Sequence, residues 1–337
     1  MRHPTVALTS AIHPVGERIL REGGCELRVA PDPKPETLLA TCADADAVIV
    51  RALLPPDLID RSPRLLAAVR HGAGVDLIPV DRATALGVCV GFVPGVNANA
   101  VAEFVVAQML AAARNVQRMD QVLRADGWSR ARAIADGASE LGGKTLGVVG
   151  VGSIGTRLAD IAHHGFRMRV LGFRRDRTKL PPFVAHAELD RLFTEADYVV
   201  LACPLTPDTR GLASAALLAR MRPTAWLLNV SRGAVVDEPA LVEALAARHI
   251  AGAVLDVFAT QPLAEDHPLR ALPNAILTPH TAGLSAESMR AMSEIAATDT
   301  LRILRGERPQ HLFNADVWPR FLERRRALGW PAEGATK

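Results

Sequence analysis

The sequence predicts an α/β protein made of two doubly wound domains, each built on a parallel sheet. Short apolar runs alternate with helical stretches along most of the 337 residues. A glycine-rich turn at 150–155 follows one apolar run and opens a helical stretch. The chain is also long enough for about two domains with large cores, since single domains hold roughly 100 to 200 residues.

The composition is that of an ordinary globular protein and excludes several other classes. Hydrophobic residues make up 49% and charged residues 22% of the chain, and the formal net charge is +3. The arginines are scattered and do not form a basic stripe, so no nucleic-acid binding is predicted. The longest apolar runs are far shorter than the ~20 residues of a membrane-spanning helix. No membrane association is therefore predicted.

The cysteines point to a reducing compartment. The four of them, at 25, 42, 89 and 203, have no paired spacing. No signal peptide is expected before them. They are expected to be reduced thiols of a cytoplasmic protein, and no metal is expected.

The first ninety-odd residues are expected to form one domain, because short strands and helices alternate there. The expected strands lie at 5–8, 25–29, 47–50, from 67, and at 88–93, and the expected helices at 16–22, 36–42 and 80–86. The fourth strand runs into the turn Arg70-His71-Gly72-Ala73-Gly74. Backbone N–H groups of this turn could converge on a small anion such as a carboxylate. A plain connection from strand to helix would use the same glycines.

A long helix rich in alanine and valine is expected at 97–113, where the chain crosses into a second domain. The next segment, 114–143, is polar, contains Trp128 and many arginines, and has no strand pattern. A segment of this length inside a compact fold is more often an interaction arm than a free loop. We therefore expect it to contact a second subunit, which would make the protein a homodimer.

The glycines at 150, 152 and 155 form a dinucleotide-binding pattern. Gly150 permits a tight turn, Gly152 lets the backbone approach a pyrophosphate, and Gly155 lets the helix pack against the strand. The amides of residues 152–154 would then point at the anion. An apolar strand precedes the turn and a second one at 168–173 closes a βαβ unit. This context favours a dinucleotide site over an ordinary glycine turn.

The later part of the chain continues the alternation of a parallel, doubly wound sheet. Strands are expected at 198–202, 225–229, 253–255 and 275–277, and helices at 188–193, 214–221 and 238–247. Polar residues follow the carboxyl ends of these strands, where such sheets bind ligands. A last long helix at 285–304 is expected to return to the first domain.

These elements divide the chain into three parts. Residues 1–96 and 288–315 are expected to form a substrate-binding domain. Residues 97–287 are expected to form a dinucleotide-binding domain with the dimerisation arm near 114–143. Residues 316–337 carry an arginine triplet at 324–326 and end in Pro, Gly and Ala, so a solvated tail is expected there.

With these loops in view, the chain resembles the D-2-hydroxyacid dehydrogenase family, which includes glyoxylate/hydroxypyruvate reductases and phosphoglycerate dehydrogenases. The resemblance covers about residues 45 to 313 and rests on several motifs in one order, at 72–76, 97 with 101–103, 150–155, 203–209, 229–237, 255–258 and 278–283. It implies a Rossmann coenzyme domain inserted in a flavodoxin-like substrate domain. It also implies hydride transfer between a nicotinamide cofactor and a small 2-keto or 2-hydroxy acid.

The chemistry of this reaction agrees with the roles that the resemblance implies. A cation must grip the substrate carboxylate and polarise the carbonyl, which suits Arg232. A group with a pKa near neutrality must give a proton to the developing alkoxide, which suits His280. Asp256 resembles the residue that receives the nicotinamide carboxamide, although a carboxylate that caps a loop would look the same.

The resemblance also implies a set of ligand contacts. The substrate would contact the amides of Ala73 and Gly74. Arg51 and His71 are candidates for lining its side-chain end, and each could equally be an ordinary surface or core residue. The cofactor would be held by residues in the motifs, namely Gly150, Gly152, Ser153, Ile154, Gly155, Arg174, Arg175, Val101, Cys203, Pro204, Thr209, Val230, Ser231, Asp256, Ala282 and Gly283.

One departure from the family concerns the partner of the histidine. The family has an acidic residue there, whereas this chain has Gln261. A glutamine can orient the imidazole of His280 through a hydrogen bond but cannot stabilise its cation by charge. Glutamine at this point also resembles the formate dehydrogenase branch of the superfamily, whose reaction needs no proton transfer. Hydride transfer of the formate dehydrogenase type is therefore an alternative.

A second departure concerns the choice of cofactor. Proteins that prefer NAD usually have an acidic residue at the end of the second strand, about 20 residues beyond the glycines. Arg174 falls at that position here, and Arg175 follows it. Two guanidinium groups suit the 2′-phosphate of NADP(H), which is therefore favoured. NAD(H) remains open if Arg174 faces solvent and Asp176 holds the ribose.

A different class of function is a nucleotide-responsive, corepressor-like binding protein with weak or absent turnover. Loss of the acidic partner favours it slightly. The presence of both Arg232 and His280 argues against it.

Overall fold

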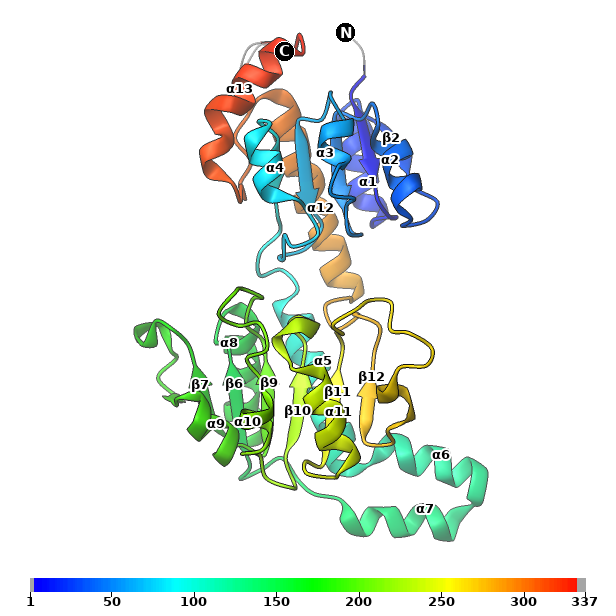
Figure 1. The fold of residues 1–337 in the computed structure, drawn as a ribbon, viewed down its shortest axis with the longest axis vertical. Coiled ribbons are helices and arrows are strands. Elements are labelled where there is room, and N and C mark those ends of the chain that lie inside the picture. Colours follow the sequence, from blue (N-terminus) through cyan, green and yellow to red (C-terminus); the bar gives the residue numbers. More distant parts are fainter. Residues whose placement is uncertain (1–2, 332–337) are drawn as a thin grey trace. The chain divides into compact units, whose positions relative to one another are not determined.

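The computed structural model describes residues 3–331, and the chain divides into two compact units. Unit 1 contains the residues up to Asn97 and those from Ser285 onward, and unit 2 is Ala98–Leu284 (Figure 1). Each unit is a parallel sheet with helices on both faces. The predicted α/β class with two doubly wound sheets is confirmed. In the part of the chain that is described, no helix is both long and apolar enough to cross a membrane.

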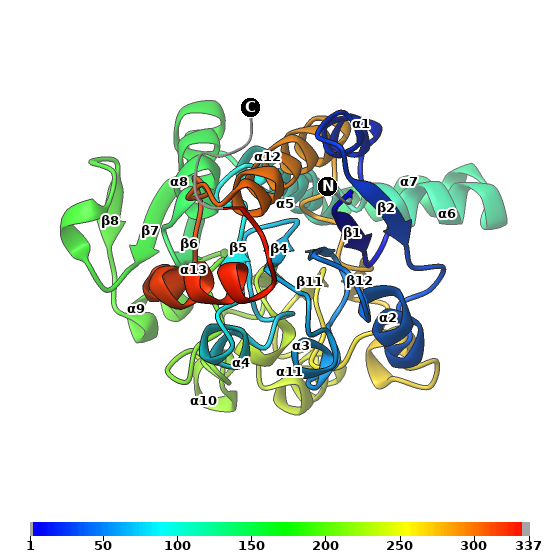
Figure 2. The same cartoon turned by 90° about the horizontal axis from the view of Figure 1, so that it is seen from above.

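Unit 1 has five parallel strands in the order β2-β1-β3-β4-β5, which is the flavodoxin-like order. The strands are β1 Thr5–Leu8, β2 Glu26–Val29, β3 Ala47–Val50, β4 Ala67–Arg70 and β5 Cys89–Gly91. The helices are α1 Pro14–Glu22, α2 Pro35–Cys42, α3 Leu58–Arg61, α4 Val80–Ala85, α12 Ala286–Arg305 and α13 Trp318–Ala327. Figure 2 shows α1 and α12 side by side, in agreement with their many contacts.

The central strands of unit 1 bury both faces because neighbouring side chains point in opposite directions. In β3, Ile49 packs with α1, α12 and α13, whereas Val48 and Val50 pack with α2, α3 and α4. Such a strand must be apolar throughout, which explains its Ala-Val-Ile-Val sequence.

The C-terminal segment corrects one expectation, because its described part does not form a solvated tail. Trp318–Ala327 is helix α13, and Phe321 is completely buried in the core of unit 1. Arg325 is also buried, and its guanidinium lies over the Trp330 ring and donates to the carbonyl of Leu304. Only part of the arginine triplet therefore faces solvent. The remainder of the expected tail, residues 332–337, lies outside the described residues.

Unit 2 has seven parallel strands in the order β12-β11-β10-β9-β6-β7-β8. This is a Rossmann arrangement extended by one strand at the β12 edge. The strands are β6 Thr145–Val149, β7 Arg169–Phe173, β8 Val184–His186, β9 Tyr198–Leu201, β10 Trp226–Asn229, β11 Gly252–Leu255 and β12 Ala275–Leu277. Helix α5 Ala98–Arg114 and helix α8 Ser153–Asp160 cover one face. Helices α9 Leu189–Glu195, α10 Ala215–Leu218 and α11 Glu238–Ala246 cover the other. Edge strand β8 was not predicted.

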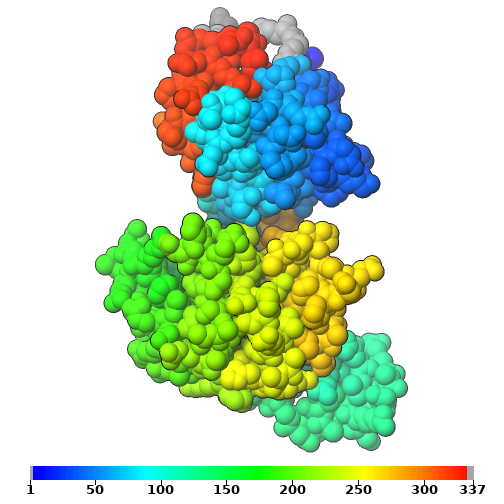
Figure 3. Space-filling model, viewed as in Figure 1, coloured from blue at the N-terminus to red at the C-terminus, as the bar shows by residue number. Residues whose placement is uncertain are grey.

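The segment expected to be an arm contains two helices, α6 Val116–Asp126 and α7 Trp128–Ile134. They pack on each other and stand away from the sheet of unit 2 (Figures 1 and 3). Helix α6 has no buried residue, and α7 buries only Ala131. Trp128 on α7 is 74% exposed, and Val116 and Leu123 on α6 are also exposed. The arm thus presents apolar side chains that nothing in unit 2 covers.

Candidate active site

The glycine turn after β6 has the geometry of a dinucleotide cradle. Gly150 has φ +98°, and a Cβ there would lie 2.6 Å from the backbone nitrogen of Cys203. A Cβ on Gly155 would lie 2.4 Å from the Gly150 carbonyl oxygen, so both positions require glycine. A Cβ on Gly152 would meet nothing within 4 Å, and no side chain caps the start of α8. The first-turn amides of α8, around Ser153 and Ile154, thus suit a pyrophosphate.

Arg174 follows β7 beside this turn. Its guanidinium donates to the carbonyl oxygens of Val151 at 2.6 Å and Lys179 at 3.3 Å. It helps to line a pocket of about 620 Å³ together with Gly152, Ser153, Thr156, Arg157, Asp160, Pro181 and Phe183. Arginine therefore reaches the rim of the cradle at the position where an acidic residue would select NAD.

The two neighbours of Arg174 have partners of their own. Arg175 forms an ion pair of 2.5 Å with Asp208, in the loop after β9. The Asp176 carboxylate accepts from the Thr178 amide at 3.2 Å and from its hydroxyl at 2.6 Å, and it pairs with Lys179 at 3.2 Å. The Thr178 hydrogen bonds and Lys179 lower the pKa of Asp176. Asp176 thus serves as the cap of a short turn.

The loop after β9 is closed by its own hydrogen bonds. The Thr209 hydroxyl donates to the Pro204 carbonyl at 2.7 Å and accepts from the Thr206 amide at 2.8 Å. Cys203 is buried at its start, and burial raises the pKa of the thiol. Other expected cofactor residues are also buried, namely Val101, Val230, Ser231 and Ala282, and Gly283 is partly buried.

Arg232 lies in the segment after β10, which Asn229 holds in shape. The Asn229 side-chain oxygen accepts from the amide and the hydroxyl of Ser231, at 3.0 and 2.8 Å, and its NH₂ donates to the Arg232 carbonyl at 2.9 Å. Asn229 is 1% exposed. Sequence reasoning missed this role, although an amide at the end of a strand just before the arginine was the available signal.

Gly233 brings the arginine segment against the loop that follows β11. A Cβ at Gly233 would lie 1.9 Å from the carbonyl carbon of Phe258 and 2.3 Å from the amide nitrogen of Ala259. Only glycine can therefore occupy this position. Arg232 and the loop that carries Gln261 consequently belong to directly contacting segments.

His280 follows β12 and has φ +56°, a left-handed conformation that is uncommon for residues other than glycine. Buried Asp256 clamps the turn. Its carboxylate accepts from the Thr278 hydroxyl at 2.7 Å and from the amides of Thr281 and Ala282 at 2.8 and 2.9 Å. Its carbonyl accepts from the His280 amide at 2.8 Å. Asp256 therefore caps a loop, which was the alternative to binding the nicotinamide carboxamide. A carboxylate has about four acceptor sites, so Asp256 can still accept from a further donor.

The pair expected between Gln261 and His280 is present in unit 2. The Gln261 side-chain oxygen lies 3.1 Å from His280 Nδ1. Because an amide oxygen can only accept, it directs the Nδ1 proton toward Gln261. Both side chains are exposed.

Unit 1 carries the predicted carboxylate loop. Arg70 braces it, because its guanidinium donates to the carbonyls of Gly74, Val50 and His71 at 3.0, 2.8 and 2.9 Å. Gly72 has φ +146° and packs over that guanidinium. The loop therefore has a defined backbone, although the role of the Ala73 and Gly74 amides toward a carboxylate stays a prediction.

His71 and Arg51 do not have the open positions that were expected for substrate-lining side chains. His71 is 3% exposed, and its Nε2 lies 2.7 Å from the Ser293 hydroxyl of α12. The Arg51 guanidinium donates to the Ala11 carbonyl and lies 3.9 Å from the Met289 sulfur. Burial lowers the pKa of both groups. His71 is thus a buried residue of unit 1, covered by a helix from the far end of the chain, and its contact with the substrate stays a prediction.

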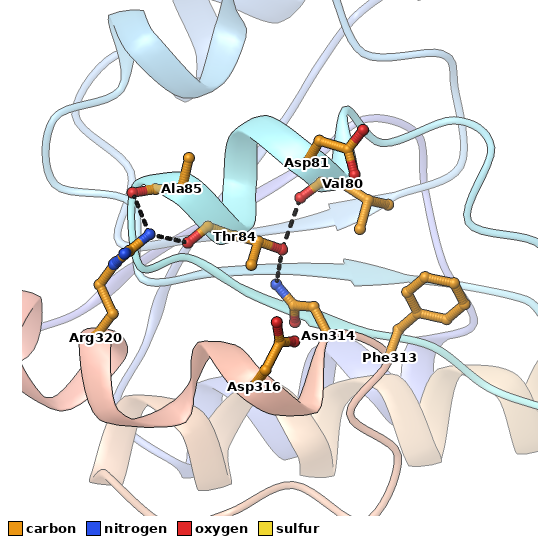
Figure 4. Close-up of a pocket in the computed structure, with 8 residues that line it drawn as sticks. All are labelled: Val80, Asp81, Thr84, Ala85, Phe313, Asn314, Asp316 and Arg320. Atoms are coloured by element: carbon orange, nitrogen blue, oxygen red, sulfur yellow. Dashed lines mark hydrogen bonds between the residues drawn. The ribbon is translucent and has the colours of Figure 1, made fainter.

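Another pocket, of about 450 Å³, lies in unit 1 between α4 and the 313–320 segment (Figure 4). The Thr84 hydroxyl donates to the Val80 carbonyl at 2.9 Å and accepts from Asn314 at 2.8 Å. Arg320 donates to the Ala85 carbonyl at 3.1 Å. These bonds dock the C-terminal segment on α4, and no predicted site residue lines this pocket.

Comparison with known proteins agrees with this geometry. The family described as D-isomer specific 2-hydroxyacid dehydrogenase, NAD binding domain, matches residues 106–282. The glyoxylate reductase of Aeropyrum pernix is 38% identical over 94% of this chain and 98% of its own. The structure of the TT0316 protein from Thermus thermophilus matches with a TM-score of 0.84 and 34% identity, over 92% of this chain and 99% of that one.

A further structure, the NADPH-dependent glyoxylate/hydroxypyruvate reductase of Sinorhizobium meliloti in complex with NADP and malonate, matches with a TM-score of 0.81. It is 28% identical, over 94% of this chain and 98% of that one. Together with the glycine cradle and the loops of Arg232 and His280, these matches show that the chain belongs to the D-isomer specific 2-hydroxyacid dehydrogenase family and is an NAD(P)-dependent 2-hydroxyacid dehydrogenase.

Proposed function

We propose that this enzyme uses NADPH to reduce a small 2-keto acid, such as glyoxylate or hydroxypyruvate, and that it acts as a homodimer. The observation that carries the proposal is the His280 turn. His280 has a left-handed backbone conformation, Asp256 holds the turn around it, and Gln261 hydrogen-bonds its ring. The turn follows a strand of the same sheet as the strand that precedes the glycine cradle. Such a turn presents one imidazole edge in a defined orientation. The names of the relatives support the choice of substrate.

Three side chains of unit 2 have separate roles in the proposed reaction. When bound, NADPH supplies the hydride. Arg232 binds the substrate carboxylate and polarises the carbonyl, because a guanidinium offers two parallel donors and a fixed positive charge. His280 gives its Nε2 proton to the oxygen on which negative charge develops. Gln261 keeps the other ring nitrogen, Nδ1, in its protonated form.

The reaction is tested by following cofactor oxidation with glyoxylate, hydroxypyruvate, pyruvate and phenylpyruvate. We expect turnover with at least the two smallest substrates. Absence of turnover with every keto acid, despite cofactor binding, would contradict the proposal. If the same preparation then oxidised formate, the result would favour the formate dehydrogenase alternative that Gln261 suggests. If it did not oxidise formate either, the result would favour the binding-protein alternative.

The preference for NADPH depends on Arg174, whose guanidinium lines the pocket beside the cradle. The variant Arg174→Asp is expected to lower kcat/KM for NADPH by about 10- to 100-fold, because one charge-assisted contact is lost and a repelling charge is added. Its kcat/KM for NADH should be unchanged or higher. Arg177→Ala is the control, since that exposed arginine pairs with Glu188. A wild-type enzyme that prefers NADH would contradict the proposed preference.

The homodimer would use the arm of α6 and α7. Trp128, Val116 and Leu123 are large apolar side chains exposed on helices that contribute almost nothing to the core of unit 2. We expect sedimentation to give a dimer for the wild type and a monomer for Trp128→Asp. Ala185→Asp on edge strand β8 adds the same charge at an exposed site and should leave the dimer intact. A monomeric wild type would contradict this part of the proposal.

The four cysteines, which are all free and buried, fit the predicted reducing compartment. A cytoplasmic location remains a prediction.

A further inference from the structure

One carboxylate of unit 2, that of Glu238, holds both ends of the loop that carries Gln261. Oxygen Oε2 accepts from the Ala259 amide at 3.0 Å, and oxygen Oε1 lies 3.2 Å from His267 Nε2. The side chains of Glu238 and His267 are 15% and 22% exposed, so the contact between them is largely shielded from water, whereas the bond from the Ala259 amide lies at the surface. Partial burial makes such charge-assisted contacts stronger than surface pairs.

The orientation of His267 is fixed from its other side. Its Nδ1 accepts from the Leu269 amide at 3.3 Å, where His267 caps the short turn Pro268–Ala271. The ring proton of a neutral imidazole is then on Nε2, which faces Glu238. The completely buried Leu269 anchors the turn in the core of unit 2. The contact with Glu238 therefore joins the end of the loop, at His267, to a turn that is anchored in the core of unit 2.

The loop between these two anchors is mostly exposed. Residues 259–262 and 264–266 all face solvent, and Gln261 lies near the first anchor. Within it, Leu263 is partly buried against the core of unit 2, and the Ala264 carbonyl accepts from the His267 amide at 3.2 Å. The Glu238 carboxylate adds the bond to the Ala259 amide, two residues before Gln261.

Glu238 is also close in sequence to the substrate-binding arginine. It is the first residue of α11 and follows the segment of Arg232 and Gly233. That segment contacts the loop at Phe258 and Ala259, where the Glu238 carboxylate accepts a hydrogen bond from the Ala259 amide. A single side chain therefore joins the segment that presents Arg232 to the loop that presents Gln261.

We propose that Glu238 is a positioning residue, which places Gln261 against His280 and so orients the proton donor. The proposal rests on the proposed role of His280 and Gln261. Glu238 acts on the reaction only through Gln261.

A double-mutant cycle tests this proposal on the full-length enzyme. We expect Glu238→Ala and Gln261→Ala each to lower kcat by about tenfold, because small displacements of a catalytic group cost 10- to 100-fold. The double variant should be no slower than the slower single variant. The KM for NADPH should stay within about twofold, since the cradle is not changed. Glu243→Ala, on the exposed side of the same helix, is the matched control and should leave kcat unchanged.

Two further variants keep the test decisive if Glu238→Ala folds poorly. Glu238→Gln keeps the size of the side chain and one accepting oxygen, so it should recover part of the lost kcat. His267→Ala removes one anchor and leaves the other, and its loss of kcat should also disappear in the Gln261→Ala background. Melting temperatures of all variants report whether the fold is intact.

The outcomes separate this inference from the proposed function. If Gln261→Ala alone leaves kcat unchanged, the proposed pair with His280 fails. If Gln261→Ala lowers kcat but Glu238→Ala does not, the positioning role fails while the pair stands. If the two losses multiply in the double variant, Glu238 supports the fold in general, and the positioning role fails as well.

Discussion

Replacing His280 with alanine is expected to lower kcat by about 10²- to 10⁴-fold, the usual contribution of a positioned proton donor. The alkoxide that forms from the keto acid would have to take its proton from water. Asp256 would still clamp the turn through the Thr278 hydroxyl and the Thr281 and Ala282 amides. Binding of NADPH, measured by quenching of protein fluorescence, should therefore be retained. The loss should appear in kcat.

His249→Ala is the matched control, because His249 is an exposed histidine of unit 2 that hydrogen-bonds only a backbone carbonyl in the described contacts. It should keep the wild-type kcat. A His280→Ala enzyme with more than about a tenth of the wild-type kcat would exclude His280 as the proton donor. That result would favour chemistry without a proton transfer, as in formate oxidation.

The contact between His280 and Gln261 was predicted from the resemblance to the family, whose histidine has a partner at the position of Gln261. The structure explains it, because the two residues follow the neighbouring parallel strands β12 and β11. The carboxyl ends of such strands meet at one edge of the sheet, so polar residues there come together regardless of their distance in sequence. The parallel, doubly wound sheets were predicted from the alternation of apolar runs and helices, and their Rossmann and flavodoxin-like arrangements were implied by the resemblance to the family. The role of Asn229 was not predicted, although it lies inside a recognised motif, because its hydrogen bonds depend on the local turn of the backbone.

Other features could not be predicted because they depend on distant segments. The side chain of His71 is covered by Ser293, which is 222 residues away in the sequence. Nothing near His71 shows that it faces inward. Similarly, the arginine triplet does not reveal that Arg325 is buried with its guanidinium over the Trp330 ring, because a docked helix buries only one of its faces. Edge strand β8 is only three residues long, too short for a clear pattern.

Burial of His71 has a consequence for the stability of unit 1 in acid. Burial, and then the guanidinium groups of Arg51 and Arg70, lower the pKa of His71 from 6.5 to about 4. As the pH falls through 6.5, the His71 imidazole becomes protonated in the unfolded chain but stays neutral in the folded chain. The free energy of unfolding therefore falls. Above pH 6.5 the imidazole is neutral in both states and contributes no pH dependence. The loss is complete below about pH 4.

Between pH 7.5 and 4.5 we expect this one group to remove about 2 to 3 kcal/mol from the free energy of unfolding of unit 1. The measurement is urea unfolding of the wild type and of His71→Gln at both pH values, followed by hydrogen exchange in peptides of β3 and β4. Glutamine can hydrogen-bond Ser293 but does not titrate, so other acid-sensitive groups cancel in the comparison. The wild type should lose about 2 to 3 kcal/mol more than the variant. Equal losses in the two proteins would show that His71 accepts a proton in the folded state at its ordinary pKa. The closed contact with Ser293 would then not describe the enzyme in solution.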